Sequence, residues 1–157
     1  MKDYISHVGH YGITVSSLEK TREFYENVLG FEYDGKLVKE DGSDILDYPS
    51  YEEVTGVPGV KFRIMNMKGY GVNLEFLQYV YPEEIKIDVQ PYICGTSHLA
   101  LVVKDPDKAY AELRAKGVKV SSNRAVCIEA GTHKGVYANY FRDPDGFILE
   151  FVKPMEE

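Results

Sequence analysis

The sequence predicts an α+β fold built from two copies of one module, in which a strand and a helix are followed by a short antiparallel meander. Two observations indicate the repeat. His10 opens an apolar, strand-like segment, and so does His98. Each histidine is followed downstream by a glutamate inside a second apolar segment, Glu75 in the first copy and Glu150 in the second. Corresponding segments in a chain of 157 residues indicate two half-size modules that share one domain.

Local signals define the first module, which spans about residues 5–80. Residues 7–15 are interpreted as a strand. Ser16 and Ser17, with Glu19 close behind, form the capping box that starts a helix, and Gly30 is placed to end it. Three further strands are expected at about 31–39, 60–67 and 72–80.

The second module, about 96–153, repeats this order. Asp105 and Pro106 supply a helix N-cap and a first-turn proline, and Gly117 ends the helix. Residues 81–95 are interpreted as the linker, and the whole chain, 1–157, as a single domain. Strands are expected at about 118–121, 124–129, 136–142 and 147–153.

The first copy carries an insertion. His10 and Glu75 are 65 residues apart, whereas His98 and Glu150 are 52 residues apart. The additional residues fall in 40–59, which is rich in glycine, proline, acidic residues and tyrosine. A loop of this length is typically a lid or a binding loop, and a solvated surface excursion is the alternative.

The two histidines and two glutamates are the candidate metal ligands. Taken singly, a strand histidine or a half-buried glutamate is more often an ordinary structural residue. A carboxylate among apolar strand neighbours costs several kcal/mol unless it has a partner charge, and a divalent cation is the strongest partner. Four matched positions therefore predict one site made of His10, Glu75, His98 and Glu150. These donors leave open positions for water or substrate, and zinc, nickel, cobalt, manganese and iron all accept them.

Composition excludes several other classes of function. There are 18 basic and 25 acidic residues, so the net charge of −7 would repel a nucleic acid backbone. No apolar run approaches the ~20 residues that span a bilayer, and the first residues lack the apolar region of a signal peptide, so we expect a cytoplasmic protein with no membrane partner. Cys94 and Cys127 are too few for a disulfide framework and are interpreted as reduced thiols.

The chain resembles the vicinal oxygen chelate (VOC) superfamily, which includes glyoxalase I, bleomycin-resistance proteins and extradiol dioxygenases. The turn Asp143–Gly146 before the last strand is the most specific match. The resemblance implies paired βαβββ modules that form an open, cup-shaped mixed sheet around a metal ion, commonly in a homodimer. It also favours His10 over His7 as a ligand, because the histidine stands two residues before Gly-Ile. The matching segments are His10–Val15, Phe24–Phe31, Leu74–Glu75, His98–Val103 and Phe141–Glu150.

Other residues are expected to contact a small-molecule substrate. Asn73 and Tyr79 share the strand face of Glu75. Arg63, on the preceding strand, is expected either to pair with an anionic substrate group or to be an ordinary ion-paired residue. Asn139 or Tyr140 is expected to line the cup. His133, in a glycine-flanked loop, is interpreted as a solvated residue, with substrate contact as the alternative.

The resemblance implies chemistry in which a divalent metal chelates two substrate oxygens and stabilises an enolate or oxyanion. Glu150 and Glu75 are then the catalytic proton-transfer groups on opposite sides of one carbon, as isomerisation or epimerisation requires. We therefore predict a metal-dependent lyase or isomerase of glyoxalase I type, or an epimerase. The alternatives are an extradiol-type dioxygenase, a fosfomycin-resistance-like transferase and a non-catalytic binding or resistance protein. The substrate, and whether the modules pair within one chain or across a dimer, stay open.

Overall fold

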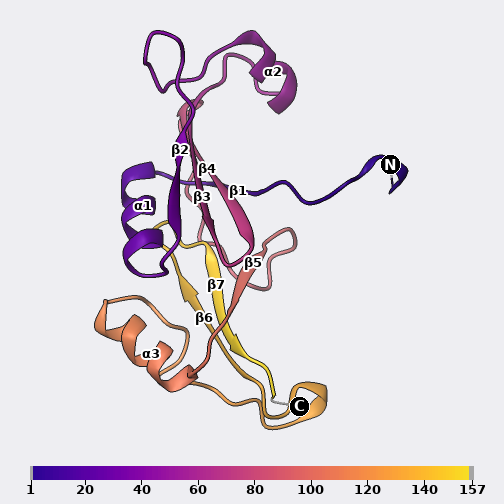
Figure 1. Cartoon of the computed structure of the whole chain (residues 1–157), viewed down its shortest axis with the longest axis vertical. Coiled ribbons are helices and arrows are strands. Elements are labelled where there is room, and N and C mark those ends of the chain that lie inside the picture. The colour runs from indigo at the N-terminus through magenta and orange to yellow at the C-terminus, as the bar shows by residue number, and fades with distance from the viewer. Residues whose placement is uncertain (1, 156–157) are drawn as a thin grey trace. The chain divides into compact units, whose positions relative to one another are not determined.

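The computed structural model describes residues 2–155 and confirms the α+β class (Figure 1). The chain divides into two compact units, Met1–Ile85 and Lys86–Glu157. The last strand of unit 1 ends at Tyr81 and the first strand of unit 2 begins at His98, so the expected linker lies between the two sheets in the sequence. Among residues 2–155, no helix is both long enough and apolar enough to cross a bilayer.

Unit 1 holds a four-stranded mixed sheet in the order β1-β4-β3-β2. β1 runs parallel to β4, and the other neighbouring strands are antiparallel. The elements are a 3-10 helix Lys2–Tyr4, β1 Tyr11–Thr14, α1 Leu18–Asn27, β2 Glu32–Lys36, α2 Pro49–Thr55, β3 Lys61–Gly69 and β4 Val72–Tyr81.

The first strand of unit 1 starts later than the sequence predicts, whereas the predicted helix cap is confirmed. The first strand begins at Tyr11 and not at residue 7. Just before it, the Gly9 carbonyl accepts a hydrogen bond from the side-chain amide of Asn73 at 3.1 Å. The N-cap of α1 is Ser17, whose hydroxyl accepts from the backbone N–H of Lys20. The buried face of α1 packs on one side of the sheet, where the Tyr25 and Phe76 rings lie 4.7 Å apart.

The insertion at 40–59 is a folded part of unit 1, because its apolar side chains are buried. Leu46 forms an antiparallel bridge with Phe62, and Leu46, Val60, Phe62 and Ile64 form a buried cluster. Tyr51 of α2 packs against the same cluster, with its ring 4.9 Å from that of Phe62. The insertion therefore caps the end of β3 and β4 at which α2 is seen in Figure 1, and it is not a solvated excursion.

Unit 2 holds a three-stranded sheet in the order β5-β7-β6, with β5 parallel and β6 antiparallel to β7. The strands predicted at 118–121 and 124–129 are wrong, since these segments form only the isolated bridges Val120↔Phe141 and Cys127↔Tyr137. The elements are β5 His98–Val102, α3 Pro106–Ala115, a 3-10 helix Gly131–His133, β6 Tyr137–Arg142 and β7 Ile148–Lys153.

A buried side chain explains why residues 122–126 leave the strand pattern. Asn139 is 4% exposed. Its Oδ1 accepts from the N–H of Val126 at 2.9 Å, and its Nδ2 donates to the carbonyl of Arg124 at 3.1 Å and to the hydroxyl of Ser122. The side-chain amide of Asn139 thus satisfies backbone groups of this segment that would otherwise pair with a neighbouring strand.

Candidate functional site

Unit 1 brings His10 and Glu75 together across the β1–β4 pair. His10 immediately precedes β1, and Gly12 pairs in register with Glu75 on β4. The Nε2 atom of His10 lies 3.4 Å from Oε1 of Glu75. The imidazole is exposed, whereas the carboxylate is mostly shielded, with 21% of its side chain accessible. Gly12 places no side chain between the two groups.

Unit 2 repeats this arrangement with other residues. His98 is the first residue of β5, and Ala100 pairs with Glu150 on β7. The Nε2 atom of His98 lies 3.2 Å from Oε2 of Glu150, whose side chain is 17% accessible. In both units the histidine therefore stands two residues before a small residue that is opposite the glutamate. The repeat seen in the sequence extends to the register of the strands.

The faces of the strands explain why both glutamates are available to a ligand. On β4, Leu74 and Phe76 are fully buried on the side that α1 covers. Glu75 points to the other side, because successive residues of a strand alternate. On β7, the buried Leu149 and Phe151 flank Glu150 in the same way. Each carboxylate thus lies on the sheet face opposite the two buried side chains that flank it in its strand.

Tyr140 lies beside the unit 2 pair. It is directly opposite Glu150 in the β6–β7 register, and its ring centroid is 5.2 Å from that of His98. Asn139, the neighbouring candidate, pairs with Phe151 and therefore lies on the other face. Its amide is engaged by the 122–126 segment, so contact of Asn139 with a substrate stays a prediction that these hydrogen bonds disfavour.

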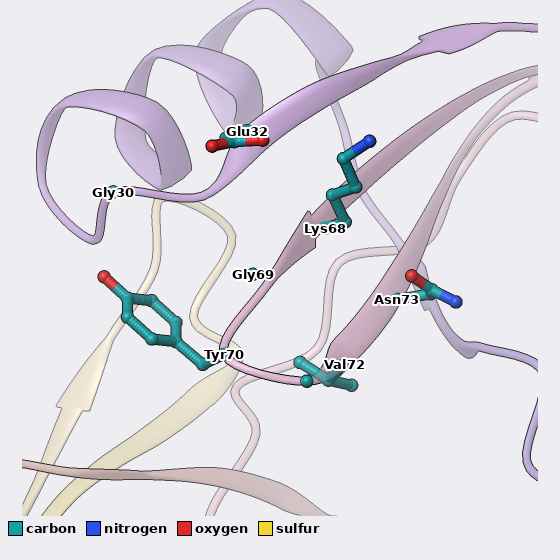
Figure 2. Close-up of a pocket in the computed structure, with 8 residues that line it drawn as sticks. Gly30, Glu32, Lys68, Gly69, Tyr70, Val72 and Asn73 are labelled. Carbon is teal, nitrogen blue, oxygen red and sulfur yellow. The ribbon is translucent and has the colours of Figure 1, made fainter.

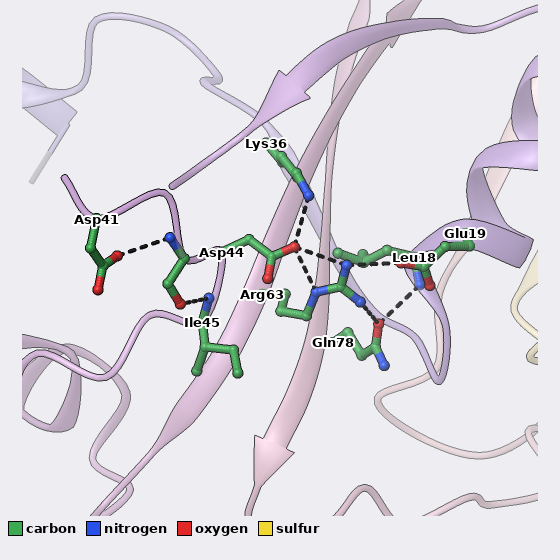
Figure 3. Close-up of polar contacts among 9 residues, drawn as sticks. Leu18, Glu19, Lys36, Asp41, Asp44, Ile45, Arg63 and Gln78 are labelled. Atoms are coloured by element: carbon green, nitrogen blue, oxygen red, sulfur yellow. Dashed lines mark hydrogen bonds and ion pairs between the residues drawn. The ribbon is translucent and has the colours of Figure 1, made fainter. Parts of the chain in front are cut away.

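Arg63 has protein partners, which is the alternative that the sequence left open (Figure 3). It pairs in register with Gln78, on the face opposite Glu75. Its guanidinium donates to Glu19 at 2.8 Å, to Asp44 at 3.0 Å and to Gln78 at 3.1 Å. The bond from Arg63 holds the pKa of Glu19 below its usual value. These contacts disfavour the predicted role of Arg63 in binding a substrate anion.

Asn73 and Tyr79 both lie on the Glu75 face, at opposite ends of it. Asn73 is bonded to the carbonyl of Gly9 and so fixes the residue before His10. Tyr79 packs in the insertion cluster, with its ring 5.7 Å from that of Phe62. Their contact with a substrate stays a prediction.

The remaining histidines are separate from these pairs. His7 is exposed, and its Nδ1 lies 2.7 Å from the hydroxyl of Ser6. His133 is exposed in the 3-10 helix that precedes β6. Neither has a carboxylate partner among the ion pairs of residues 2–155.

Sequence reasoning missed Asn66, which is directly opposite Glu75 on β3. The signal that would have found it is the tight turn at Tyr70 and Gly71, because a two-residue hairpin loop fixes the register of its strands. Gly69 pairs with Val72, and counting back from this pair places Asn66 against Glu75.

An open pocket of about 540 Å³ lies at the turn between β3 and β4 (Figure 2). It contains none of the four candidate ligands, and only Asn73 is shared with the site described above. Two of its polar groups are already engaged, because Lys68 pairs with Asp34 at 3.0 Å and the Tyr70 hydroxyl donates to the carbonyl of Leu29 at 2.7 Å. We therefore place the candidate site at the His–Glu pairs and not in this pocket.

The turn that precedes β7 contains a carboxyl with a perturbed pKa. Burial raises the pKa of Asp143 to about 6. Its Oδ1 accepts from the N–H groups of Asp145 and Phe147, so the side chain holds the turn together. This turn fixes the point at which β7 begins and therefore the position of Glu150 in that strand.

The donor chemistry of the two pairs fits a metal ion. Imidazole nitrogen and carboxylate oxygen are the donors that zinc, iron, cobalt, nickel and manganese accept. Within residues 2–155, no three side chains of His, Cys, Asp or Glu are grouped closely enough to hold a metal, and the donors are present as two pairs, one in each unit. Neither pair alone provides the three or four protein ligands of an ordinary site.

Comparison with known proteins identifies relatives over nearly the whole chain. The sequence is 30% identical over 146 residues to a 2-epi-5-epi-valiolone epimerase from Actinomyces sp, covering 92% of this chain and 78% of the relative. A glyoxalase family protein from Bacillus cereus has the same fold, with a TM-score of 0.78 at 16% identity, over 99% of this chain and 98% of that one. The trypanothione-dependent glyoxalase I of Leishmania major also shares the fold, with a TM-score of 0.60 at 20% identity over 92% and 84% of the two chains.

Members of the family that this chain matches commonly bind a divalent metal ion and small-molecule ligands, and they are often dimeric. The match covers residues 7–151, which include all four candidate ligands and the turn before β7. The chain belongs to the Glyoxalase/Bleomycin resistance protein/Dioxygenase superfamily.

Proposed function

We propose that this protein is a metal-dependent epimerase or glyoxalase-type isomerase that acts on a small carbonyl compound with two chelating oxygens. The observation that carries the proposal is the equivalence of the two His–Glu pairs. Each pair occupies the same register position in its unit, and each glutamate lies on the strand face opposite its two buried sequence neighbours. Structural residues such as Gly30 and Gly117 recur in the two copies as well, but the recurring residues here are partly accessible imidazole and carboxylate groups, which are the donors of a metal site.

His10, Glu75, His98 and Glu150 are the residues that would hold the ion, once the two units bring their pairs together. A bound divalent ion would polarise a chelated carbonyl and stabilise the charge of its enolate. The two pairs of one site would come either from one chain or from the two chains of a homodimer, which family members often form. Their incomplete coordination within each unit supports a site shared between units.

The two glutamates are the proton-transfer groups of the proposal. Each carboxylate keeps some accessibility and has a histidine within 3.4 Å. A carboxylate can accept a proton from a carbon next to a carbonyl and return it, and two carboxylates on opposite sides of that carbon can invert it. Tyr140, opposite Glu150, supplies a phenol that can donate a hydrogen bond to a substrate oxygen.

Two likenesses support this class of reaction. The relative from Actinomyces is named an epimerase, and an epimerase must remove and return a proton or an equivalent group at one carbon. The Leishmania protein that shares the fold is named a glyoxalase I. An extradiol-type dioxygenase would use two histidines and one carboxylate, so a second glutamate at the equivalent position favours proton transfer.

The test combines metal analysis with proton exchange. We expect protein purified without chelators to hold up to one divalent ion per pair of units, and to incorporate solvent deuterium next to the carbonyl of a 2-hydroxy ketone. Glu75→Gln should keep most of the metal, because an amide oxygen can still coordinate, but should slow exchange by about 10²-fold or more, because an amide is not a base. Glu32→Gln is the matched control, since Glu32 is an exposed glutamate on β2 of the same sheet.

Three outcomes would contradict the proposal. One is the absence of bound metal in wild-type protein supplied with each of the five ions. Another is oxygen uptake with catechols under iron(II) without any deuterium incorporation, which would indicate a dioxygenase. The third is ligand binding by a metal-loaded protein that exchanges no protons, which would indicate a binding protein.

A further inference from the structure

Asn66 occupies the centre of the sheet face on which Glu75 lies. It is the β3 residue directly opposite Glu75, and residues paired in this way have Cβ atoms about 5 Å apart. Its side chain is half-buried. Within residues 2–155, the Asn66 amide has no hydrogen-bond partner. A partly exposed amide that no protein group engages is free to bond to solvent or to a bound ligand.

Every neighbour of Asn66 on this face is already engaged. Toward the β3–β4 turn, the next cross-strand pair is Lys68 with Asn73. Lys68 is ion-paired with Asp34, and Asn73 bonds to Gly9. In Figure 2 these two side chains lie on adjacent strands.

In the other direction, the next cross-strand pair is apolar. Ile64 is opposite Leu77, and both pack in the cluster that the insertion covers. Glu75 itself faces His10. Asn66 is therefore the one polar side chain of these three cross-strand pairs that has no protein partner in the described part of the chain.

We propose that Asn66 binds an oxygen of the substrate next to the two chelating oxygens, and that its amide selects neutral, hydroxylated ketones. The inference rests on the proposed function, because it places the reacting carbonyl beside Glu75. An amide can donate to a carbonyl and accept from a hydroxyl, so it suits a neutral polar group. The one cation in these three pairs, Lys68, is engaged by Asp34, so this face is less suited to a carboxylate or a phosphate.

In the second unit, a different kind of polar side chain lies opposite the glutamate. The position equivalent to Asn66 is Tyr140, which is opposite Glu150. One glutamate thus has an amide opposite it and the other a phenol. If a substrate contacts both carboxylates, as the proposed function requires, it would meet a different hydrogen-bonding group beside each one, and this difference would fix its orientation.

The test uses two probes that differ by one hydroxyl group, hydroxyacetone and dihydroxyacetone, on zinc-loaded wild-type protein and on Asn66→Ala. Both probes contain the chelating hydroxy-ketone, and only the second offers an extra hydroxyl. NMR titration of ¹⁵N-labelled protein gives each Kd, and deuterium incorporation gives each exchange rate. We expect wild type to bind dihydroxyacetone about tenfold more tightly, the effect of one hydrogen bond, and Asn66→Ala to bind the two probes equally.

Asn123→Ala is the matched control, since Asn123 is an exposed asparagine in a loop of unit 2, and it should keep the tenfold preference. A second measurement follows Asn66 in wild type itself. The side-chain NH₂ signals of Asn66, identified by their loss in Asn66→Asp, should shift with dihydroxyacetone and much less with hydroxyacetone.

The outcomes separate the inference from the proposed function. Suppose that zinc and both probes bind. If wild type then shows no preference for dihydroxyacetone, or if Asn66→Ala retains the preference of wild type, the role of Asn66 is refuted and the proposed function stands. Equal weakening of both probes in Asn66→Ala would show a structural role and would also refute the inference. If wild type binds no metal, the proposed function fails and takes the inference with it.

Discussion

Replacing Asp143 by asparagine should change how the stability of the protein depends on pH. Asp143 is 6% exposed and begins the turn before β7. Its Oδ1 accepts from the N–H of Asp145 at 2.9 Å and from the N–H of Phe147 at 2.8 Å. An amide oxygen can accept the same two bonds, so Asp143→Asn keeps the turn and removes only the titration.

The magnitude follows from the pKa of this carboxyl. Burial raises the pKa of Asp143 from 3.8 to about 6, which corresponds to about 3 kcal/mol. Between these two values the native carboxyl holds a proton that the unfolded chain has already released. The stability associated with this proton is fully present below pH 3.8 and is lost as the pH rises through about 6.

The assay is urea unfolding of wild type and Asp143→Asn across pH 3.5 to 7. Other titrating groups are common to both proteins, so their effects cancel in the difference between the two free energies of unfolding. We expect the variant to gain about 3 kcal/mol relative to wild type over this range. A difference that does not vary with pH, or one that moves the other way, would show that the two backbone N–H groups outweigh burial and that the carboxylate is the favoured native form.

Three further predictions concern the site and its supports. His10→Ala should remove most of the bound divalent ion measured by elemental analysis, whereas His7→Ala should not, and equal losses would show that the wrong histidine was chosen. Arg63→Met should lower the free energy of unfolding by about 1 kcal/mol. The loss should be smaller in high salt, because the partners Glu19 and Asp44 are partly solvated, and an effect that salt does not reduce would contradict the ion-pair account. Leu46→Ala should cost about 2–4 kcal/mol and make the insertion sensitive to proteases, and unchanged proteolysis would show that the insertion does not depend on its cluster.

Sequence reasoning succeeded where the controlling interactions are local. The helix starts follow from caps a few residues long, and the Asp105 side chain does accept from the backbone N–H of Lys108 as its position predicts. Gly30 and Gly117 have φ values of +77° and +76°, the left-handed conformation that ends both helices. The repeat was visible for the same reason, since each copy carries its own signals.

The errors arose where a distant segment decides the outcome. Residues 124–129 have the composition of a strand, but the buried amide of Asn139 binds the backbone of this segment in place of a full ladder. The insertion was expected to be a lid or binding loop because of its length, and that role stays a prediction. Its helix α2 and its buried cluster depend on Phe62 and Ile64, which come later in the chain.

The sequence by itself determined the α+β class and the two matched His–Glu pairs, because strand alternation and helix caps act over a few residues. Only the tertiary structure decided which residues are opposite one another. Register placed Asn66 against Glu75 and Tyr140 against Glu150, and it turned Arg63 toward Gln78 on the other face. The physical reason is that register is set by hydrogen bonds between strands, and a shift of one residue moves every side chain to the opposite face.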